Sequence, residues 1–517
     1  MFAMSLHATS VGSPAWGSGP VVALDREEAV RHRLATLFAR WGYRRVRTPL
    51  WEEAGPPLLE VFPETALCRF VDPSGRVLAL RPDHTLAVAR WAAPRFRGPD
   101  PWRLSYIDAV YRRDPRDGRF HAVTQAGVEL LGLPAPAGDV ELLGLVLDAL
   151  DGLGLGGTSP DGPATSVRVT VGHVGVLQAV LASHGVDGTA AGAILAALVR
   201  RDRVALRREL EATLGAAATA RLYPVLVRSL PPDAAREWLA ELDGEAAAGL
   251  AATLEAVGRL FGSKQVARIR VEPGLVRDLQ YYTGLVVEVF AGRRRIAAGG
   301  RYDGLLARFG GQGPAVGLAF DVEAVAEATA MEAAADPHAV VAMGAAVGER
   351  GGAAGTPDPD PGPAARELRD AVAPAIGPSP TRARGGAAHG GATRAGGSGP
   401  QAAWDGTVGR STSTGDESGP PPAAGGAGAP IDYLVAGPAP SAGAGAEDAR
   451  WAVTARLWEE ARRLRAQGAS AVVMAGLAGE EQAAAAARRL GCLRLLWLDG
   501  TRRVLRMAWP AGEPPSA

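Results

Sequence analysis

Lysine and cysteine are nearly absent from this sequence. Lys264 is the only lysine among 55 basic residues, and it lies in no glycine-rich loop, which excludes a P-loop nucleotide site. The two cysteines, Cys68 and Cys492, are far apart in the chain. They provide neither a disulfide framework nor the close pairing of a structural zinc site. We therefore expect a protein of the reduced cytoplasm.

Net charge and long apolar runs are also missing. The 55 basic residues are balanced by 55 acidic ones, which argues against a surface dominated by attraction to nucleic acid or lipid. No apolar run reaches the roughly 18 residues of a membrane span. Residues 1–20 lack the apolar stretch of a signal peptide. The sequence predicts a protein without a membrane partner.

The chain is long enough for several domains. Residues 1–20 are predicted to be a disordered leader, and residues 21–332 form the main domain, with a helical insertion at about 139–262. Residues 333–429 are mostly Gly, Ala, Pro and Ser, which cannot bury a core, so we expect a disordered linker. Residues 430–517 alternate strand and helix patterns and predict a small C-terminal α/β module.

Helices beside antiparallel strands indicate an α+β fold for the main domain. A helix is predicted from Asp25 to Gly42, followed by a strand at Tyr43–Thr48. An antiparallel hairpin and three later strands are predicted from residue alternation and turn signals, at 102–113, 123–131, 268–272, 285–290 and 295–298.

Two segments carry polar residues where sheet packing would favour apolar ones. In Leu80–Thr85, Asp83 has an ordinary interpretation as the N-cap of the helix that follows, at about even odds. On the strand 123–131, Gln125, Gly127 and Glu129 share one face. Solvent is the usual explanation for such a face, but a glycine between two polar side chains favours a ligand cleft, because it leaves room.

A third segment, Gly274–Gly284, is followed by Gly299–Leu305. Its adjacent tyrosines could simply belong to the core. Together, however, the three segments offer arginine for a carboxylate, acidic groups for an ammonium and tyrosines to frame a ring. This combination complements a zwitterionic amino acid.

These segments resemble the signatures of class II histidyl-tRNA synthetases. The matching stretches read LRPDHT, YRRDPRDGRFHAVTQAGVE, LVRDLQYYTG and GGRYDGL, within residues 22–325. Pro49 is similar to the proline of the motif at the dimer interface. The resemblance implies an antiparallel sheet flanked by helices. It also implies that a histidine amino group meets Asp83, Thr85 and Gln125, the imidazole meets Glu129 and Tyr281 or Tyr282, and Arg277 faces the carboxylate, with Arg112 in the same pocket.

The sequence departs from the synthetases where ATP would bind. In the segment 317–324 the arginine of the synthetase motif is replaced by Ala324, and a glycine by Asp321. Both changes weaken attraction to a triphosphate. His121-Ala122 and Gln280 are further departures. Adenylation is therefore expected to be disabled, while the amino-acid pocket is nearly complete.

This combination resembles the regulatory subunits of short-form ATP phosphoribosyltransferase. The stretches 171–177 and 464–468 are also similar to that family, whereas the tract 333–429 is a departure. The resemblance implies a non-catalytic subunit of histidine biosynthesis that binds histidine as feedback effector. It further implies a self-dimer through the region of Pro49 and a separate catalytic subunit as partner, with no cofactor, metal or tRNA.

Two other functions remain open at this point. The first is an enzyme, either a divergent histidyl-tRNA synthetase or another amino-acid-activating enzyme. Ala324 and the lack of excess positive charge argue against it. The second is a structural scaffold whose histidine pocket is vestigial.

Overall fold

The computed structural model describes residues 25–335 and 431–506, apart from 57, 99, 115–116, 157–166, 187, 278–280, 439–445, 478, 491 and 499–501. The predicted leader and nearly all of the predicted linker lie outside the described residues. Helix α11 (Val322–Ala335) continues three residues past the predicted start of the linker.

A mixed eight-stranded sheet forms the centre of the main domain, in the order β1-β5-β6-β11-β10-β9-β7-β8. Only the outer pairs, β1 with β5 and β7 with β8, are parallel; every other neighbouring pair is antiparallel. This agrees with the predicted class, except that the sheet is not purely antiparallel. The strands are Arg44–Arg45 (β1), Trp102–Arg113 (β5), Phe120–Leu131 (β6), Val167–His173 (β7), Ile269–Val271 (β8), Leu285–Ala291 (β9), Arg294–Arg301 (β10) and Ala315–Asp321 (β11).

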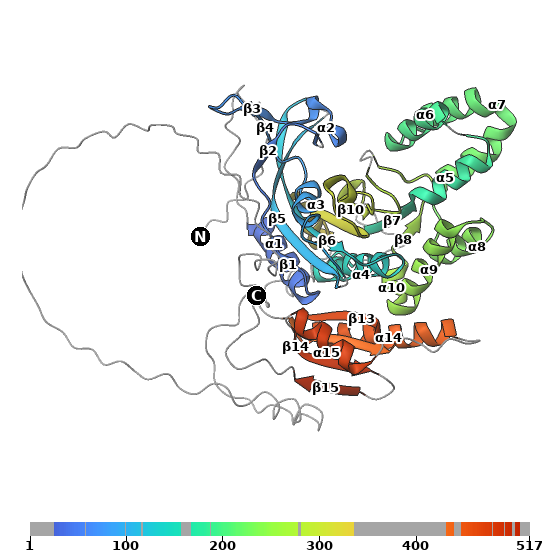
Figure 1. Cartoon of the computed structure of the whole chain (residues 1–517). Coiled ribbons are helices and arrows are strands. Elements are labelled where there is room, and N and C mark those ends of the chain that lie inside the picture. The colour runs from blue at the N-terminus through green and yellow to red at the C-terminus, as the bar shows by residue number, and fades with distance from the viewer. Residues whose placement is uncertain are drawn as a thin grey trace, which may run out of the picture. The chain divides into compact units, whose positions relative to one another are not determined.

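The predicted hairpin is confirmed as β5 and β6, two strands of 12 residues each (Figure 1). Pairing runs without interruption from Trp102 opposite Leu131 to Arg113 opposite Phe120. Strand β6 therefore begins three residues before the predicted start at Val123. An unbroken register fixes which side chains share a face, because successive residues of a strand point to opposite sides.

Helices α1 (Asp25–Arg40), α4 (Ala137–Gly152) and α11 contact the sheet or one another through a common apolar core. Helix α1, which the sequence predicted, buries Val30, Leu34 and Phe38. Helix α4 is apolar on nearly all sides and is buried along most of its length. A helix of this kind belongs in a core rather than at a surface.

The helical insertion is shorter than predicted. Helix α4 is part of the core and β7 is part of the main sheet, so the inserted helices begin only after His173. Figure 1 shows them grouped on the side of β7 and β8. They are Val174–Ser183 (α5), Gly188–Val199 (α6), Arg203–Val227 (α7), Pro232–Ala240 (α8) and Glu245–Leu260 (α9), with the short α10 (Ser263–Val266) returning to β8.

A second, three-stranded sheet precedes the hairpin, in the order β2-β4-β3. The strand predicted at Tyr43–Thr48 is reduced to Arg44–Arg45. Beyond it, the backbone carbonyl of Thr48 accepts a hydrogen bond from the side chain of Arg81. The elements of this region are Trp51–Glu53 (β2), Leu58–Val61 (α2), Glu64–Ala66 (η1), Arg69–Val71 (β3), Val77–Leu80 (β4) and Thr85–Ala92 (α3), with η2 (Leu306–Phe309) packed against α3.

The C-terminal region is the α/β module that the sequence predicted. Its sheet has the order β13-β12-β14-β15, with β12 parallel to both of its neighbours and β14 antiparallel to β15. The elements are Ile431–Pro438 (β12), Ala446–Ala466 (α14), Ala471–Leu477 (β13), Glu480–Arg489 (α15), Cys492–Leu498 (β14) and Arg502–Arg506 (β15).

The module packs on the end of α1 and belongs to the same compact unit as the main domain. The guanidinium of Arg465 lies 3.8 Å from the ring centroid of Trp41 and 5.7 Å from that of Trp458. Arg462 donates a hydrogen bond of 2.9 Å to the carbonyl of Leu260. Within the described parts of the chain, no helix has the length and hydrophobicity to cross a bilayer.

Candidate functional site

A cavity of about 760 Å³ opens over the middle strands of the main sheet. Volumes of this size are typical of small-molecule sites. The cavity is lined from β5, β6, β10 and β11, from the start of α3 and from the segment before β9. Seven of the eight predicted site residues line it: Asp83, Thr85, Arg112, Gln125, Arg277, Tyr281 and Tyr282.

The eighth, Glu129, lies directly behind the cavity wall and is 1% exposed. Its carboxylate accepts hydrogen bonds from the hydroxyls of Thr85 at 2.7 Å and Tyr106 at 3.1 Å, and from the hydroxyl of Tyr302. Burial raises the pKa of Glu129 to about 7, although the bonds from Tyr302 and Thr85 oppose the shift. The three hydroxyls, which do line the cavity, separate this carboxyl from it.

Two glycines make room for this arrangement. Gly317 pairs with Glu129 across β11 and β6, and a Cβ atom at Gly317 would overlap the Glu129 carboxyl. A Cβ atom at Gly127 would lie 2.5 Å from Cζ of Tyr106. The sequence analysis interpreted Gly127 as space for a ligand. That interpretation was wrong, because the ring of Tyr106 on the neighbouring strand occupies the space.

Asp83 caps a helix and also lies at the cavity wall. One carboxylate oxygen accepts a 3.0 Å hydrogen bond from the backbone N–H of Leu86, which caps the first turn of α3. The other lies 3.3 Å from Arg112, whose Nε also donates to the carbonyl of Pro82 at 2.7 Å. Capping and ion pairing hold the carboxylate at the cavity wall.

The residues around Asp83 keep its loop in place. Arg81 is 3% exposed, and its guanidinium donates to the carbonyls of Ala109 and Thr48 and pairs with Asp108 at 2.8 Å. His84 is fully buried and bonds Thr48 at 2.7 Å. Burial lowers the pKa of His84 to about 4, so its ring is neutral at physiological pH. These bonds tie the loop to β5.

Arg277 reaches the cavity while it is still paired with a buried carboxylate. Its guanidinium lies 3.3 Å from Glu288 and 5.9 Å from the ring centroid of Tyr282. Glu288 also pairs with Arg201 at 2.5 Å and Arg295 at 3.0 Å, and is 4% exposed. Nε of Arg277 is buried without a hydrogen-bond partner among the described residues. This cation therefore keeps donor capacity for a ligand carboxylate.

The segment that departs from the synthetases is part of the fold. Ala324 is fully buried in α11, and its N–H donates a 2.8 Å bond to the Asp321 carboxylate, which thus caps this helix. The two changes remove a cation and add an anion in this segment, as the sequence indicates. Arg294 of β10 lines both the main cavity and the small hollow that contains Ala324.

Two kinds of residue line the cavity without having been predicted from the sequence. Tyr302 was within the quoted GGRYDGL stretch but was not selected, and Tyr106 has no local signal beyond its place opposite Gly127. The other kind is a group of arginines in and after the turn between β9 and β10: Arg293, Arg294 and Arg295.

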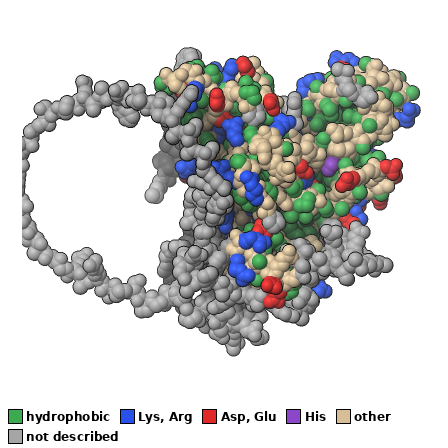
Figure 2. All heavy atoms as spheres, viewed as in Figure 1, with side chains coloured by type: hydrophobic (Ala, Val, Ile, Leu, Met, Phe, Trp, Pro, Cys, Tyr) green, Lys and Arg blue, Asp and Glu red, His purple; other side chains and the backbone are tan. Residues whose placement is uncertain are grey.

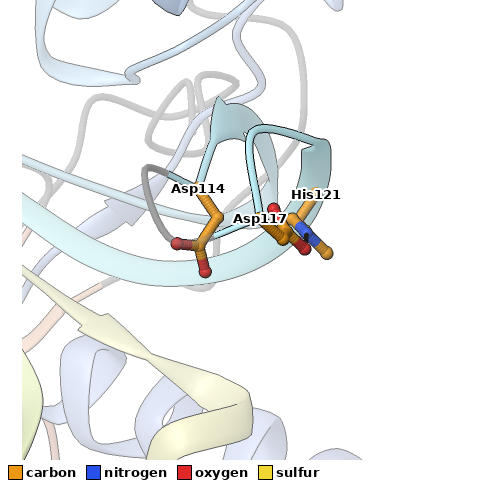
Figure 3. A group of neighbouring side chains, drawn as sticks. All are labelled: Asp114, Asp117 and His121. Atoms are coloured by element: carbon orange, nitrogen blue, oxygen red, sulfur yellow. Dashed lines mark hydrogen bonds and ion pairs between the residues drawn. The ribbon is translucent and has the colours of Figure 1, made fainter.

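One further group of side chains has a spacing that a metal ion could use. The ligand atoms of Asp114, Asp117 and His121 lie within 4.8 Å of one another at the tip of the β5–β6 hairpin (Figure 3). His121 already bonds Asp117 at 2.8 Å, and both side chains are exposed. The sequence analysis, which expected no metal, did not single out this group. Exposed groups of this kind are common without an ion, so we assign no metal to it.

Comparison with known proteins places the chain in a family. The family model described as histidyl-tRNA synthetase matches residues 22–325. An ATP phosphoribosyltransferase regulatory subunit from Moorella thermoacetica is 36% identical over 305 residues, which cover 57% of this chain and 75% of that protein. One from Anaeromyxobacter dehalogenans is 38% identical over 306 residues, covering 57% of this chain and 84% of that protein.

Solved structures agree with this placement. The histidine–tRNA ligase subunit from Alicyclobacillus acidocaldarius has a TM-score of 0.51 at 30% identity, covering 64% of this chain and 100% of its own. An ATP phosphoribosyltransferase regulatory subunit/histidyl-tRNA synthetase from Bacillus halodurans has a TM-score of 0.53 at 20% identity and covers 95% of this chain and 98% of its own, which shows the same fold. On these matches, the chain belongs to the ATP phosphoribosyltransferase regulatory subunits, a family built on the class II histidyl-tRNA synthetase fold.

Proposed function

We propose that this chain is a non-catalytic, histidine-sensing subunit that assembles with a separate ATP phosphoribosyltransferase catalytic subunit and mediates feedback inhibition by histidine. The observation that carries the proposal is the buried Glu129 carboxyl, which lies behind Thr85, Tyr106 and Tyr302 at one end of the cavity. Its pKa of about 7 is close to that of an imidazole, so the two groups can exchange a proton through the hydroxyls that lie between them.

The rest of the cavity suits the remaining groups of the amino acid. Asp83 and Gln125 offer acceptors for the ammonium, and Arg277 offers donors for the carboxylate, while Tyr281 and Tyr282 border the space for the ring. A few charge-assisted hydrogen bonds, at about 1.5–3 kcal/mol each, are enough for micromolar affinity. A coupling of about 1–3 kcal/mol between this site and the partner would change activity from several-fold to about a hundredfold.

Two features support a regulatory rather than an enzymatic role. The arginine of the synthetase ATP motif is replaced by the buried Ala324. On the face that Figure 2 shows, basic and acidic side chains are interspersed, which argues against a tRNA-binding surface on this face.

The cellular compartment that we propose is the reduced cytoplasm. Cys68 and Cys492 are both free, which is compatible with it.

We also propose a self-dimer through the small sheet β2-β4-β3 and the chain just before it. Five of the nine exposed large hydrophobic side chains among the described residues lie here, including Trp51 at 54% and Val71 at 66% exposure. A concentration of this kind marks an interaction surface, and a second copy would cover it with matching apolar residues. Sedimentation velocity should show a dimer for the full chain and a monomer for Val71→Glu.

The decisive experiment is co-purification of the full chain with a short-form catalytic subunit. We expect the pair to have phosphoribosyltransferase activity that histidine inhibits. Arg277→Gln should leave the complex intact but raise the inhibitory histidine concentration about tenfold or more, because it removes a charged bond to the ligand. Arg236→Gln, an exposed substitution on α8, is the matched control.

Two results would replace this proposal. Histidine-dependent exchange of ATP with pyrophosphate by the purified chain would show an amino-acid-activating enzyme. Normal inhibition in the Arg277→Gln complex, without heat of histidine binding, would show a scaffold with a vestigial pocket.

A further inference from the structure

One carboxylate of the main sheet connects the cavity to the inserted helices. Glu288 of β9 is 4% exposed. It pairs with Arg277, which lines the cavity, at 3.3 Å, and with Arg201 at 2.5 Å. Arg201 lies between α6 and α7, so this pair joins the inserted helices to the sheet. Residues that share one buried carboxylate are energetically coupled, because a bond that one of them gives up becomes available to the other.

The arginines around Glu288 use different oxygens of its carboxylate. Arg201 donates to Oε2, whereas Arg295 and Arg277 both donate to Oε1, at 3.0 and 3.3 Å. The contact of Arg277 is the longest of the three. Because one guanidinium can bond both oxygens of a carboxylate, a free Oε2 would let Arg277 form a second bond to Glu288. Arg201 occupies the oxygen that this second bond would need.

The backbone at Arg201 is held in an unusual conformation. Its φ of 53° is the only positive φ of a non-glycine residue in the described part of the chain. Such a conformation is unfavourable for a residue with a Cβ atom and persists where the surrounding contacts hold it. The N–H of Arg201 donates to the carbonyl of Leu198 at the end of α6. Asp202 then caps α7. The corner between the two helices is therefore fixed on both sides of Arg201.

Two further contacts direct the Arg201 side chain toward β9. Its guanidinium lies 5.1 Å from the ring centroid of Phe290, two residues beyond Glu288 on the same strand. It also lies 3.7 Å from the carboxylate of Glu272. Since the side chain of Arg201 is 47% exposed, water competes for its donors. The ring and the second carboxylate favour the conformation that reaches Glu288 over a solvated one.

We propose that Arg201 is a positioning residue for histidine, which acts through Glu288 on Arg277. By holding Oε2, it keeps Glu288 from pairing with Arg277 through both oxygens. Nε of Arg277, which has no hydrogen-bond partner among the described residues, then stays available to the ligand carboxylate. This role of Arg201 rests on the proposed histidine-sensing function. It adds a residue of the inserted helices to a pocket whose other members come from the sheet, the start of α3 and the segment before β9.

Titration calorimetry on the full chain tests this role, with histidine and histidinol as the probes. Histidinol has a hydroxymethyl group in place of the carboxylate, so it lacks the group that Arg277 binds. Arg201→Asn removes the guanidinium, and asparagine tolerates the left-handed backbone. We expect this variant to bind histidine about fivefold or more weakly and histidinol as the parent does. Arg200→Asn, which removes the same charge from the exposed preceding residue, should bind both ligands as the parent does.

Three results would overturn the role of Arg201. They are unchanged histidine binding in Arg201→Asn, an equal loss for histidine and histidinol, and a loss of histidine binding as large in Arg200→Asn. The second of these would make Arg201 a structural residue of the inserted helices, since a distorted pocket weakens both ligands. Absence of histidine binding by the parent is a distinct failure, because it would contradict the sensing function itself and this role with it.

Discussion

Arginine–carboxylate pairs occur in two settings in this molecule, and their geometry differs. On α4, Glu141 pairs with Arg103 and Asp139 with Arg301, each at 2.7 Å and with all four side chains no more than 4% exposed. In the cavity, Asp83 pairs with Arg112 and Glu288 with Arg277, each at 3.3 Å.

We call the α4 pairs closed, because both partners are buried and are joined by short hydrogen bonds. Arg103 bonds both oxygens of Glu141, and one of these also accepts a bond from Tyr43. In contrast, the partners of each cavity pair share a single, longer contact, and Nε of Arg277 has no hydrogen-bond partner among the described residues. A closed buried pair contributes to the fold because neither partner can be lost alone. An open pair can exchange its partner for a ligand at little cost.

The difference between the two settings is tested most directly by replacing one arginine from an α4 pair and one from a cavity pair. Arg103→Met should lower the free energy of unfolding by about 3–5 kcal/mol, since it leaves Glu141 charged and buried. Arg112→Met should lower it by about 0–1 kcal/mol, because that arginine is 36% exposed. Urea denaturation followed by circular dichroism measures both. Equal losses in the two variants would show that the settings do not differ.

A pH series tests whether the Glu129 carboxyl is closed off from water. Because its pKa is raised to about 7, the folded state holds a proton that the unfolded chain releases near pH 4.5. The group's contribution is complete below pH 4.5 and is lost as pH rises through 7. The stability difference between the parent and Glu129→Gln should therefore change by about 3 kcal/mol between pH 5 and pH 7.5. Parallel stability curves would mean that the carboxyl titrates normally.

The smallest expected effect concerns the packing behind the cavity. Gly127→Ala should cost about 1–3 kcal/mol, because the added methyl group meets the ring of Tyr106. If this contact is the cause, Gly127→Ala with Tyr106→Leu should be more stable than the sum of the single effects predicts, by about 1 kcal/mol. Thermal unfolding of the four proteins completes the cycle, and additive effects would count against the contact.

The local parts of the site could be predicted from the sequence. Asp83 and Thr85 belong to a helix start, and Gln125 and Glu129 to one strand face, so short-range pattern was enough to single out their segments. The resemblance to the synthetases then placed these residues in one pocket. The concealment of Glu129 was not predictable, because Tyr106 and Tyr302 come from strand β5 and the segment after β10. Their hydroxyls meet only through the strand order, which no local pattern encodes.

The bounds of the strands and helices show the same difference: local patterns predicted them, and contacts between distant residues were not predicted. The hairpin and the C-terminal module have strong turn and periodicity signals, and both were found close to their observed bounds. The strand at Tyr43–Thr48 was predicted too long: it comprises only Arg44–Arg45, and the carbonyl of Thr48 bonds the distant side chain of Arg81. The nearness of Arg294 to Ala324 could not be predicted either, because the two residues meet only in three dimensions.

The contacts of Arg465 with the rings of Trp41 and Trp458 have a consequence for folding during synthesis on the ribosome. Trp41 is made long before Arg465, yet Trp458 is part of the apolar core that contains Trp41. A nascent chain therefore exposes Trp41 until α14 emerges. Such contacts between distant segments slow folding and leave apolar surface open to aggregation. Products truncated before α14 should need chaperones far more than the finished protein does.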